Sequence, residues 1–319
     1  MHRSRISHRP PPTSAAALWL CLSILLTPLS SSARTESPAP RIFACEPEWA
    51  ALVLELMPQA QVHTATTAMQ DPHHIEARPS LIAQMRQADA AVCTGGGLEA
   101  GWLPVLQQRA ANPRVQDGSD GMFYAAEQVT LIDARAATLN PFAGDIHPGG
   151  NPHVHTDPER LVQVARALAA RLQRLWPARS TEVAARLTAF EQRWSARTEQ
   201  WRQRTQALRG RTVAAQHSSF AYLWRWLGLR HSMDLEPKPG LPPTPAHLQS
   251  LLQRWQAEPP LAIVVAAHQD PRSGRWFSER AQPARPLLVL PATVIDPTQP
   301  EALDAWFEGL IDSLLRAPR

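Results

Sequence analysis

The sequence predicts an α/β protein made of two lobes that a long helix joins, and three observations predict this fold. The chain has 319 residues, more than one ordinary domain needs. Short apolar strands alternate with amphipathic helices from Arg41 onward, and the same alternation resumes at Arg211. A long polar helical pattern, rich in Arg, Gln and Glu, separates the two stretches. We therefore expect a first α/β lobe over residues 41–175, a connecting helix over 180–209 and a second α/β lobe over 210–319.

The first 33 residues have the features of a cleavable signal peptide. Arginines at positions 3, 5 and 9 precede an apolar stretch over residues 15–29, and small residues follow at 31–33. The apolar stretch contains a proline and is shorter than the roughly 20 residues that a helix needs to span a bilayer. We therefore expect residues 1–33 to be removed and the mature protein to be a soluble periplasmic protein.

The first lobe is expected to follow a β-α-β order. Its expected strands are residues 41–45, 61–66, 90–93 and 128–133, and its expected helices are residues 47–57, 79–88 and 98–109. A glycine run over residues 94–97 lies between the third strand and the helix that follows. It lacks the Lys-Ser/Thr pair of a P-loop and the spaced glycines of a dinucleotide fingerprint, so we interpret it as a tight strand-to-helix turn.

The middle of the chain contains a long loop and two helical patterns. The loop, residues 134–156, is rich in Pro, Gly, Asn and His, and loops of this length usually have a function. Helices are expected at residues 158–175 and 180–208. The two could form a solvated coiled pair, but we favour a helix that connects two lobes because the β-α alternation resumes directly after it.

The second lobe repeats the alternation of the first. Its expected strands are residues 211–215, 261–267 and 286–290, and its expected helices are residues 219–227, 246–255 and 300–316. A proline-rich connection over residues 237–245 separates the first two helices. No repeat of solenoid type is present, so two lobes joined by one helix are the simplest arrangement.

Charge argues against nucleic acid as a partner. The formal net charge is +4, but it comes from arginines spread along the chain, and Lys238 is the only lysine. Binding to nucleic acid requires clustered positive charge interleaved with aromatic residues, and the sequence lacks such a cluster.

Two cysteines, Cys45 and Cys93, remain after removal of the signal peptide, each at the end of an expected strand. In an oxidising compartment they form either a disulfide or two buried thiols, and the sequence leaves both possibilities open. Without a second cysteine pair they do not indicate a zinc site.

Three histidines share a setting that suits metal ligands. His73, His153 and His217 each lie in a loop before an expected helix, and the first two follow an Asp-Pro or Asn-Pro step. Proline restricts the backbone there, so the imidazole points in a defined direction. Three imidazoles match the nitrogen-rich ligand set of zinc, which is tetrahedral when a fourth ligand or water completes it, whereas calcium prefers oxygen. Ligands from two lobes can meet only between them, so we expect a metal site in the cleft.

Around these histidines the sequence resembles the zinc and manganese solute-binding receptors of bacterial ABC importers, over nearly all of the mature chain. The matching segments keep their order and spacing; they are residues 70–73 (QDPH) with Glu76, 94–103 (TGGGLEAGWL), 150–153 (GNPH) ending in 157–158 (DP), and 217–223 (HSSFAYL) closing on 227–229 (LGL). The resemblance implies two α/β lobes bridged by a long helix, with His73 and His153 from the first lobe and His217 from the second. It implies a non-enzymatic monomer that captures a divalent metal ion and delivers it to a membrane permease. A histidine at the third position implies zinc as the cargo in preference to manganese.

The fourth metal ligand stays open. The family usually supplies an aspartate near the final strand, but residues 289–294 read VLPATV and contain no carboxylate. Asp296, Asp270, water or a neighbouring histidine could take the position. His147 and His155 flank His153 in the long loop, where they could pass ions inward, but we favour solvent-exposed loop residues without a role. The same interpretation applies to the remaining histidines outside the leader, which are His63, His74, His231, His247 and His268.

Two other functions are weaker alternatives. A zinc hydrolase also uses three protein ligands and an open position, but the sequence has no His-Glu-x-x-His helix, and Glu76 has no partner that suggests a general base. A surface adhesin could use the same exported fold without transporting anything. The long bridging helix that the resemblance implies also predicts that the lobes move little on loading.

Overall fold

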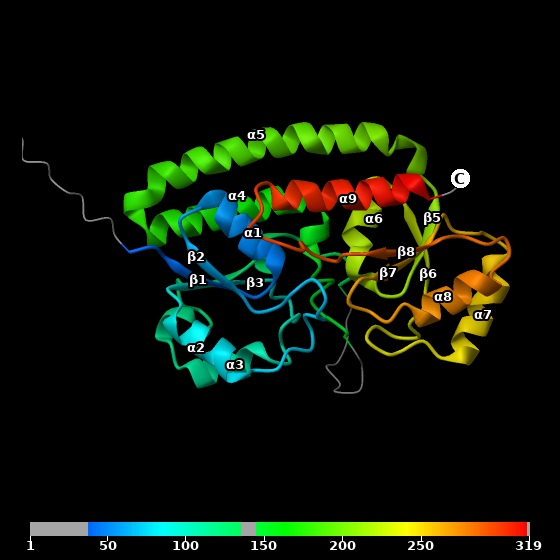
Figure 1. Ribbon diagram of the computed structural model, residues 1–319, viewed down its shortest axis with the longest axis horizontal. Coiled ribbons are helices and arrows are strands. Elements are labelled where there is room, and N and C mark those ends of the chain that lie inside the picture. Colours follow the sequence, from blue (N-terminus) through cyan, green and yellow to red (C-terminus); the bar gives the residue numbers. More distant parts are fainter. Residues whose placement is uncertain (1–37, 135–144, 318–319) are drawn as a thin grey trace, which may run out of the picture. The chain divides into compact units, whose positions relative to one another are not determined.

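A computed structural model describes residues 38–134 and 145–317 (Figure 1). The expected signal peptide, residues 1–33, lies outside the described residues, and so does part of the expected long loop. Within the described part, no helix is long and apolar enough to cross a membrane.

The first sheet contains four parallel strands in the order β2-β1-β3-β4. Its strands are β1 (Arg41–Ala44), β2 (Gln61–Thr64), β3 (Ala90–Cys93) and β4 (Met122–Tyr124). Alternate residues of β1 face opposite sides of the sheet, since Ile42 belongs to one buried cluster and Phe43 to another. The helices α1 (Pro47–Leu56) and α4 (Pro158–Leu175) therefore cover one face, whereas α2 (Pro79–Gln87) and α3 (Leu103–Ala110) cover the other.

The second sheet repeats this topology with the strand order β6-β5-β7-β8, again all parallel. Its strands are β5 (Thr212–Ala215), β6 (Arg230–Asp234), β7 (Ile263–Ala266) and β8 (Leu287–Leu290). The helices α6 (Ala221–Leu227) and α9 (Ala302–Arg316) cover one face, and α7 (Pro245–Trp255) and α8 (Arg272–Arg280) cover the other. The expected fold class, two α/β lobes with a long helix between them, is confirmed.

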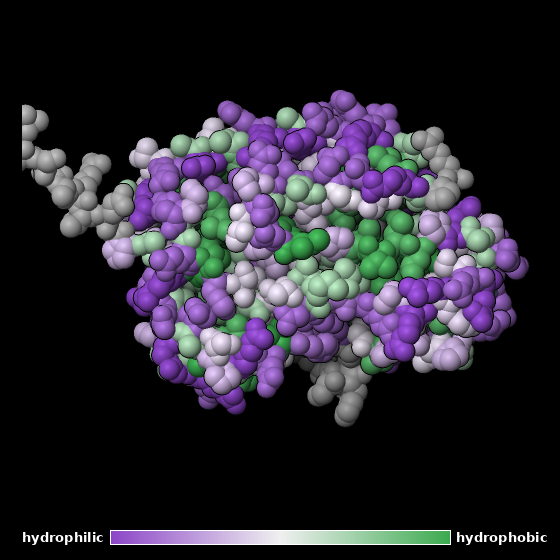
Figure 2. Space-filling view, in the orientation of Figure 1, coloured by the Kyte–Doolittle hydropathy of each residue, from purple (hydrophilic) through white to green (hydrophobic). Residues whose placement is uncertain are grey.

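The long helix α5 (Ser180–Arg204) lies beside α9; in Figure 1, α5 extends over both sheets, whereas α9 runs from α1 over the second sheet. Buried aromatic rings join the two helices, because Trp194 and Trp201 both pack on Phe307 with ring centroids 5.3 and 5.4 Å apart. Polar residues cover the outer surface along α5 in Figure 2, as its Arg, Gln and Glu content predicts. The helix is therefore solvated on one side and packed on the other, which is the pattern of a bridge and not of an isolated coiled pair.

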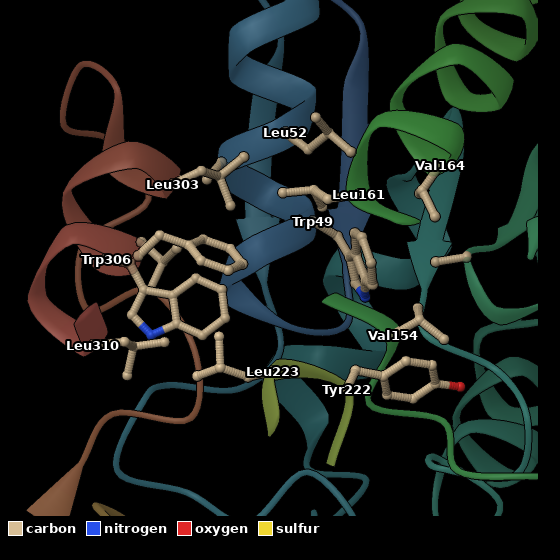
Figure 3. Close-up of a cluster of buried hydrophobic side chains, with 14 of the residues drawn as sticks. Trp49, Leu52, Val154, Leu161, Val164, Tyr222, Leu223, Leu303, Trp306 and Leu310 are labelled. Carbon is tan, nitrogen blue, oxygen red and sulfur yellow. The ribbon is translucent and has the colours of Figure 1, made fainter. Parts of the chain in front are cut away.

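One buried hydrophobic cluster continues from the first sheet to the second. Figure 3 shows Trp49 and Leu52 of α1 close to Leu303 and Trp306 of α9, with Leu223 of α6 below them. The two lobes therefore share one continuous hydrophobic core behind the sheets.

A disulfide joins Cys45 to Cys93, at the carboxyl ends of the neighbouring strands β1 and β3, with 4.7 Å between the Cα atoms. The glycine run that follows Cys93 is a tight turn, as expected. Gly95, Gly96 and Gly97 all have positive φ, and the buried Glu99 carboxylate accepts hydrogen bonds from the backbone of Thr94 and Gly95. The backbone N–H groups of Thr94 and Gly95 are therefore already hydrogen-bonded to a side chain of the protein.

Several expected elements are wrong or missing. The helix expected at residues 98–109 begins only at Leu103, and residues 128–133 form no strand. Instead, Ile132 donates its backbone N–H to the hydroxyl of Tyr222, so this stretch packs against the second lobe. The sequence interpretation also missed three elements, which are β4, β6 and α8.

Candidate metal centre

The three predicted histidines all lie in connections that leave the carboxyl ends of parallel strands. His73 lies between β2 and α2, and His153 precedes the short helix η3 (Val154–Thr156) that leads into α4. His217 lies between β5 and the short helix η6 (Ser218–Phe220). In open α/β sheets this edge is where ligands bind, because helix N-termini and loops converge there.

The structure brings the three imidazoles together. The ring centroids are 5.6 Å apart for His73 and His153, 5.7 Å for His73 and His217, and 5.8 Å for His153 and His217. One nitrogen from each ring lies within 4.8 Å of the other two. All three residues are buried, at 8%, 4% and 7% exposure. Two of these side chains come from loops of the first sheet and one from the second, so an ion among them would contact both lobes.

Two carboxylates orient two of the rings. Nδ1 of His73 donates to Asp71 over 2.7 Å, and Nδ1 of His217 donates to Glu236 over 2.8 Å. A ring that donates through Nδ1 presents the lone pair of Nε2 on its opposite side, which is how metal-binding histidines are usually held. The sequence interpretation missed both partners. Glu236 lies two residues after β6, so recognising that strand would have placed it at the same sheet edge as His217.

His153 is held by the backbone and by Asn151. The backbone N–H of His153 donates to the Asn151 side-chain oxygen over 2.9 Å, and the Asn151 amide nitrogen donates to the carbonyl of Ser218 over 3.0 Å. Asn151 therefore connects the loop of His153 to the residue that follows His217. Nε2 of His153 is buried and has no hydrogen-bond partner among the described residues, and such a nitrogen is costly unless a ligand or ion satisfies it.

Burial and the neighbouring rings set the protonation of the cluster. Burial, together with the charges of His73 and His217, lowers the pKa of His153 well below its ordinary value. For His217, burial acts in the same direction, but the hydrogen bond and charge of Glu236 outweigh it and raise the pKa. Metals bind the neutral ring, so protons compete more effectively at His217 than at His153.

His147 is not the solvent-exposed loop residue that the sequence suggested. Its Nε2 lies 3.2 Å from Nε2 of His73, and the two rings stack with centroids 5.3 Å apart. Burial, and then the charge of His73, lower the pKa of His147 to about 4. No feature of the loop sequence distinguishes His147 from a solvated histidine, because its position depends on contacts with both lobes.

His155 is also buried, at 4% exposure, so the favoured interpretation is wrong for it as well. Its Nε2 donates to the carbonyl of Ala292 over 3.0 Å, and its Nδ1 lies 3.2 Å from the carboxylate of Glu48. The same carboxylate accepts the hydroxyl of Thr293, and the ring of His155 stacks on Trp306. Residues 289–294, where the family resemblance implies an aspartate ligand, thus bind the first lobe through a carbonyl and a hydroxyl.

The other candidates lie outside the three-histidine group. Asp270 and Asp296 are exposed, and their carboxylates bind Arg272 and Thr298 of their own loops. The side chain of His74 is 67% exposed. His268, which the sequence did not single out, lines a cavity of about 380 Å³ together with His73 and His217, and burial lowers its pKa.

Comparison with known proteins identifies one matching family model and a set of solved structures with the same fold. A model of the family described as "ZnuA: Zinc-uptake complex component A periplasmic" matches residues 42–317. No curated protein matches the chain significantly.

Solved structures share the fold at low identity. A ZnuA deletion mutant with zinc bound is 20% identical, with a TM-score of 0.72 over 88% of this chain and 98% of its own. FpvC from Pseudomonas aeruginosa in complex with Mn²⁺ is 18% identical, with a TM-score of 0.72 over 87% and 97%. The laminin-binding protein of Streptococcus agalactiae, described as a bifunctional protein with adhesin and metal-transporting activity, is 20% identical, with a TM-score of 0.68 over 86% and 98%.

Proposed function

Since the chain belongs to the family of periplasmic zinc-uptake component A proteins, we propose that it captures a zinc ion in the periplasm and delivers it to the permease of an ABC importer. One observation carries this proposal: three buried imidazoles from two lobes converge with their nitrogens within 4.8 Å of one another. His73 and His153 would bind the ion from a first lobe over residues 41–175, and His217 from a second lobe over 210–319. The ion is the cargo, so the site must release it as well as bind it.

Zinc is the favoured cargo because of the chemistry of the donors. Neutral imidazole nitrogen suits zinc, whereas manganese and calcium prefer carboxylate, carbonyl and water oxygens. The two carboxylates nearest the rings, Asp71 and Glu236, accept hydrogen bonds from His73 and His217. They support the ligands and leave the nitrogens to face the ion.

A role as a metal carrier is favoured over a role as a zinc hydrolase because of the carboxylates around the site. A hydrolytic zinc needs a bound water beside a carboxylate that can take its proton. Asp71 and Glu236 are already engaged with ligand rings, and Glu76 is exposed. Asp145 has an oxygen within 4.8 Å of a His73 nitrogen, but its carboxylate faces Gly240 and His74. The adhesin alternative would use the same exported fold, and binding of the loaded protein to a laminin-coated surface would test it.

The proposal is tested by the metal content of the mature protein. We expect one equivalent of zinc in the wild type after equilibration with a mixture of divalent ions, and a loss in each of His73→Ala, His153→Ala and His217→Ala. His247→Ala is the matched control, because this ring bonds to the carbonyl of Asp234 outside the cluster. A wild type without metal, or metal content indifferent to the three changes, would refute the site.

Export is tested separately. Expression of the full chain in a Gram-negative host should give a periplasmic protein that begins at Arg34, as measured by fractionation and intact mass. A protein that keeps residues 1–33 and stays in the cytoplasm would contradict the proposed location without affecting the metal site.

A further inference from the structure

We propose that His147 supplies the fourth nitrogen of the cargo site, so that the ion is held by four imidazoles and the site selects ions that accept tetrahedral nitrogen coordination. This inference rests on the proposed function and adds a residue and a selectivity to it. His147 comes from the segment of residues 145–150, which lies just before Asn151 and His153.

The distance between two nitrogens carries the inference. Nε2 of His147 and Nε2 of His73 are 3.2 Å apart. Two nitrogens bound about 2.05 Å from a tetrahedral zinc are separated by about 3.3 Å. The His147 ring therefore stands at the spacing of a second ligand relative to His73. The nitrogens that all lie within 4.8 Å of one another belong to His73, His153 and His217, so the His147 ring must move toward the last two for all four to bind one ion.

The backbone around His147 is built to hold the ring inward. The N–H of Gly150 donates to the carbonyl of His147 over 3.0 Å, which closes a turn that leads back to His153. Gly150 has a φ of 122°, and a Cβ there would lie 2.5 Å from the Cβ of Leu131, so only glycine fits. The ring itself lies against Gly97, where a Cβ would lie 3.2 Å from Nδ1.

The same segment is fastened to the second lobe through what we call the front contact, formed by Asp145 with Pro239 and Gly240. The N–H of Asp145 donates to the carbonyl of Pro239 over 2.9 Å. A Cβ on Gly240 would lie 2.3 Å from the Asp145 carboxylate, so the glycine is what allows the close approach. Gly240 in turn donates to Glu236, the carboxylate that holds His217. The front contact thus connects the supports of His147 and His217.

Four nitrogens change which ions the site accepts. Zinc readily takes four imidazole ligands, whereas manganese prefers six ligands that are mostly oxygen. With His147 in place, the position that would otherwise hold water is closed. The chain therefore replaces the carboxylate that residues 289–294 lack with a nitrogen from the opposite lobe.

The first test compares His147→Ala with His63→Ala in competitive titrations with zinc and with manganese. His63 is also partly buried but lies on β2, outside the cluster. We expect His147→Ala to weaken zinc binding by about tenfold or more and His63→Ala to leave it unchanged. The imidazole multiple scattering in the absorption at the zinc edge should count four rings in the wild type and three in His147→Ala. His147→Asp should shift the affinity ratio toward manganese.

Equal zinc affinities for His147→Ala and His63→Ala, in a protein that still loses zinc when His73, His153 or His217 is changed, would overturn the fourth ligand and leave the proposed function intact. A wild type that binds no zinc would instead overturn the proposed function.

A second test loosens the segment without touching a ligand. Gly240→Ala and Gly210→Ala both place a side chain at positive φ, 77° and 76°, so their backbone strain is matched. Only Gly240→Ala meets Asp145, because among the described residues no atom lies within 4 Å of a Cβ at Gly210. We expect faster zinc release from Gly240→Ala alone. Equal release rates for the two variants would mean that the front contact does not position His147.

Discussion

The lobes are joined on two sides of the histidine cluster, and the two contacts differ in burial and in chemistry. On one side lies what we call the back contact, in which Glu48 and His155 bind Ala292 and Thr293. The side chains of Glu48 and His155 are 1% and 5% exposed. On the other side lies the front contact, where the side chain of Asp145 is 13% exposed and Gly240 is exposed.

This difference in burial indicates that the back contact and the front contact have different roles, one in stability and one in metal binding. The back contact is a buried network in which Nδ1 of His155 faces the Glu48 carboxylate and has no hydrogen-bond partner among the described residues. We expect this contact to contribute to stability and to keep the lobes together with or without an ion. The front contact carries His147 and is more accessible, so it contributes to binding and release. Substitutions in the back contact should therefore alter the unfolding free energy of the metal-free protein, and substitutions in the front contact should alter zinc affinity.

The largest expected effect is a loss of stability in the metal-free protein when the back contact is disrupted. Glu48→Ala removes the buried carboxylate that accepts the Thr293 hydroxyl and faces His155, and leaving a buried polar group without its partner costs about 1 to 3 kcal/mol of unfolding free energy. Urea unfolding of the metal-free protein measures it. Glu258→Ala is the control, because its pair with Arg230 is exposed and should contribute less than about 1 kcal/mol. Equal unfolding free energies for Glu48→Ala and Glu258→Ala would show that the back contact does not stabilise the metal-free protein.

The second effect is on pH dependence of zinc binding. Zinc binds the neutral ring, and Glu236 raises the pKa of His217, so protons begin to displace the ion as the pH falls toward and below this raised pKa. Affinity should then fall by up to about tenfold per pH unit for each proton taken up. In Glu236→Gln the fall should begin at lower pH. Titrations between pH 8 and pH 5 test this, and an affinity that stays flat to pH 5 would contradict the histidine site.

A smaller effect is expected for Thr293→Val. The change removes the hydroxyl that Glu48 accepts and nearly keeps the shape of the side chain, so it should cost about 1 kcal/mol in unfolding free energy. Zinc affinity should remain that of the wild type. A marked loss of zinc affinity would mean that the back contact also positions the ligands.

The smallest expected effect is the change in stability of the metal-free protein when His147 is replaced. His147→Ala should change the unfolding free energy of the metal-free protein by less than about 1 kcal/mol, because the ring is only partly buried and stacks on a single neighbouring ring, that of His73. Unfolding in excess zinc should separate the variant from the wild type, since a tighter ligand stabilises more. A large loss of stability without metal would assign His147 a structural role.

The fold could be predicted where hydrophobic periodicity is strong. Residues 41–45 and 90–93 are short apolar runs, and they form buried strands as expected. The strand β6 reads RHSMD and buries only Met233, because it is an edge strand, so no apolar alternation marks it. The helix α8 is short and rich in arginine, and its fit on the sheet depends on Gly274, where a Cβ would lie 2.8 Å from Leu287.

The wrong strand has a physical explanation too. Residues 128–133 alternate polar and apolar side chains, which resembles a half-buried strand. In the structure these apolar residues pack against Gly150 and the Tyr222 region, and Ile132 bonds to the Tyr222 hydroxyl and to the backbone of Asn151. Tertiary contacts with a distant segment therefore replaced the strand pairing that the pattern suggested.

The grouping of the candidate ligands was predictable only in part. Local motifs singled out His73, His153 and His217, whose rings the structure brings together, because proline steps and strand ends are visible in the sequence. Nothing local marks His147, which lies against His73, 74 positions earlier in the sequence, nor His155, which contacts Glu48 and Ala292. Residues that act through contacts between lobes leave no signal in their own neighbourhood.

The most direct test of the central claim is anomalous diffraction at the zinc edge from crystals of the zinc-loaded mature protein. We predict one strong peak about 2.0 to 2.1 Å from nitrogens of His73, His153 and His217, with His147 completing the tetrahedron. A peak elsewhere on the molecule, or none among these rings at full zinc occupancy, would contradict the proposed site and the function built on it.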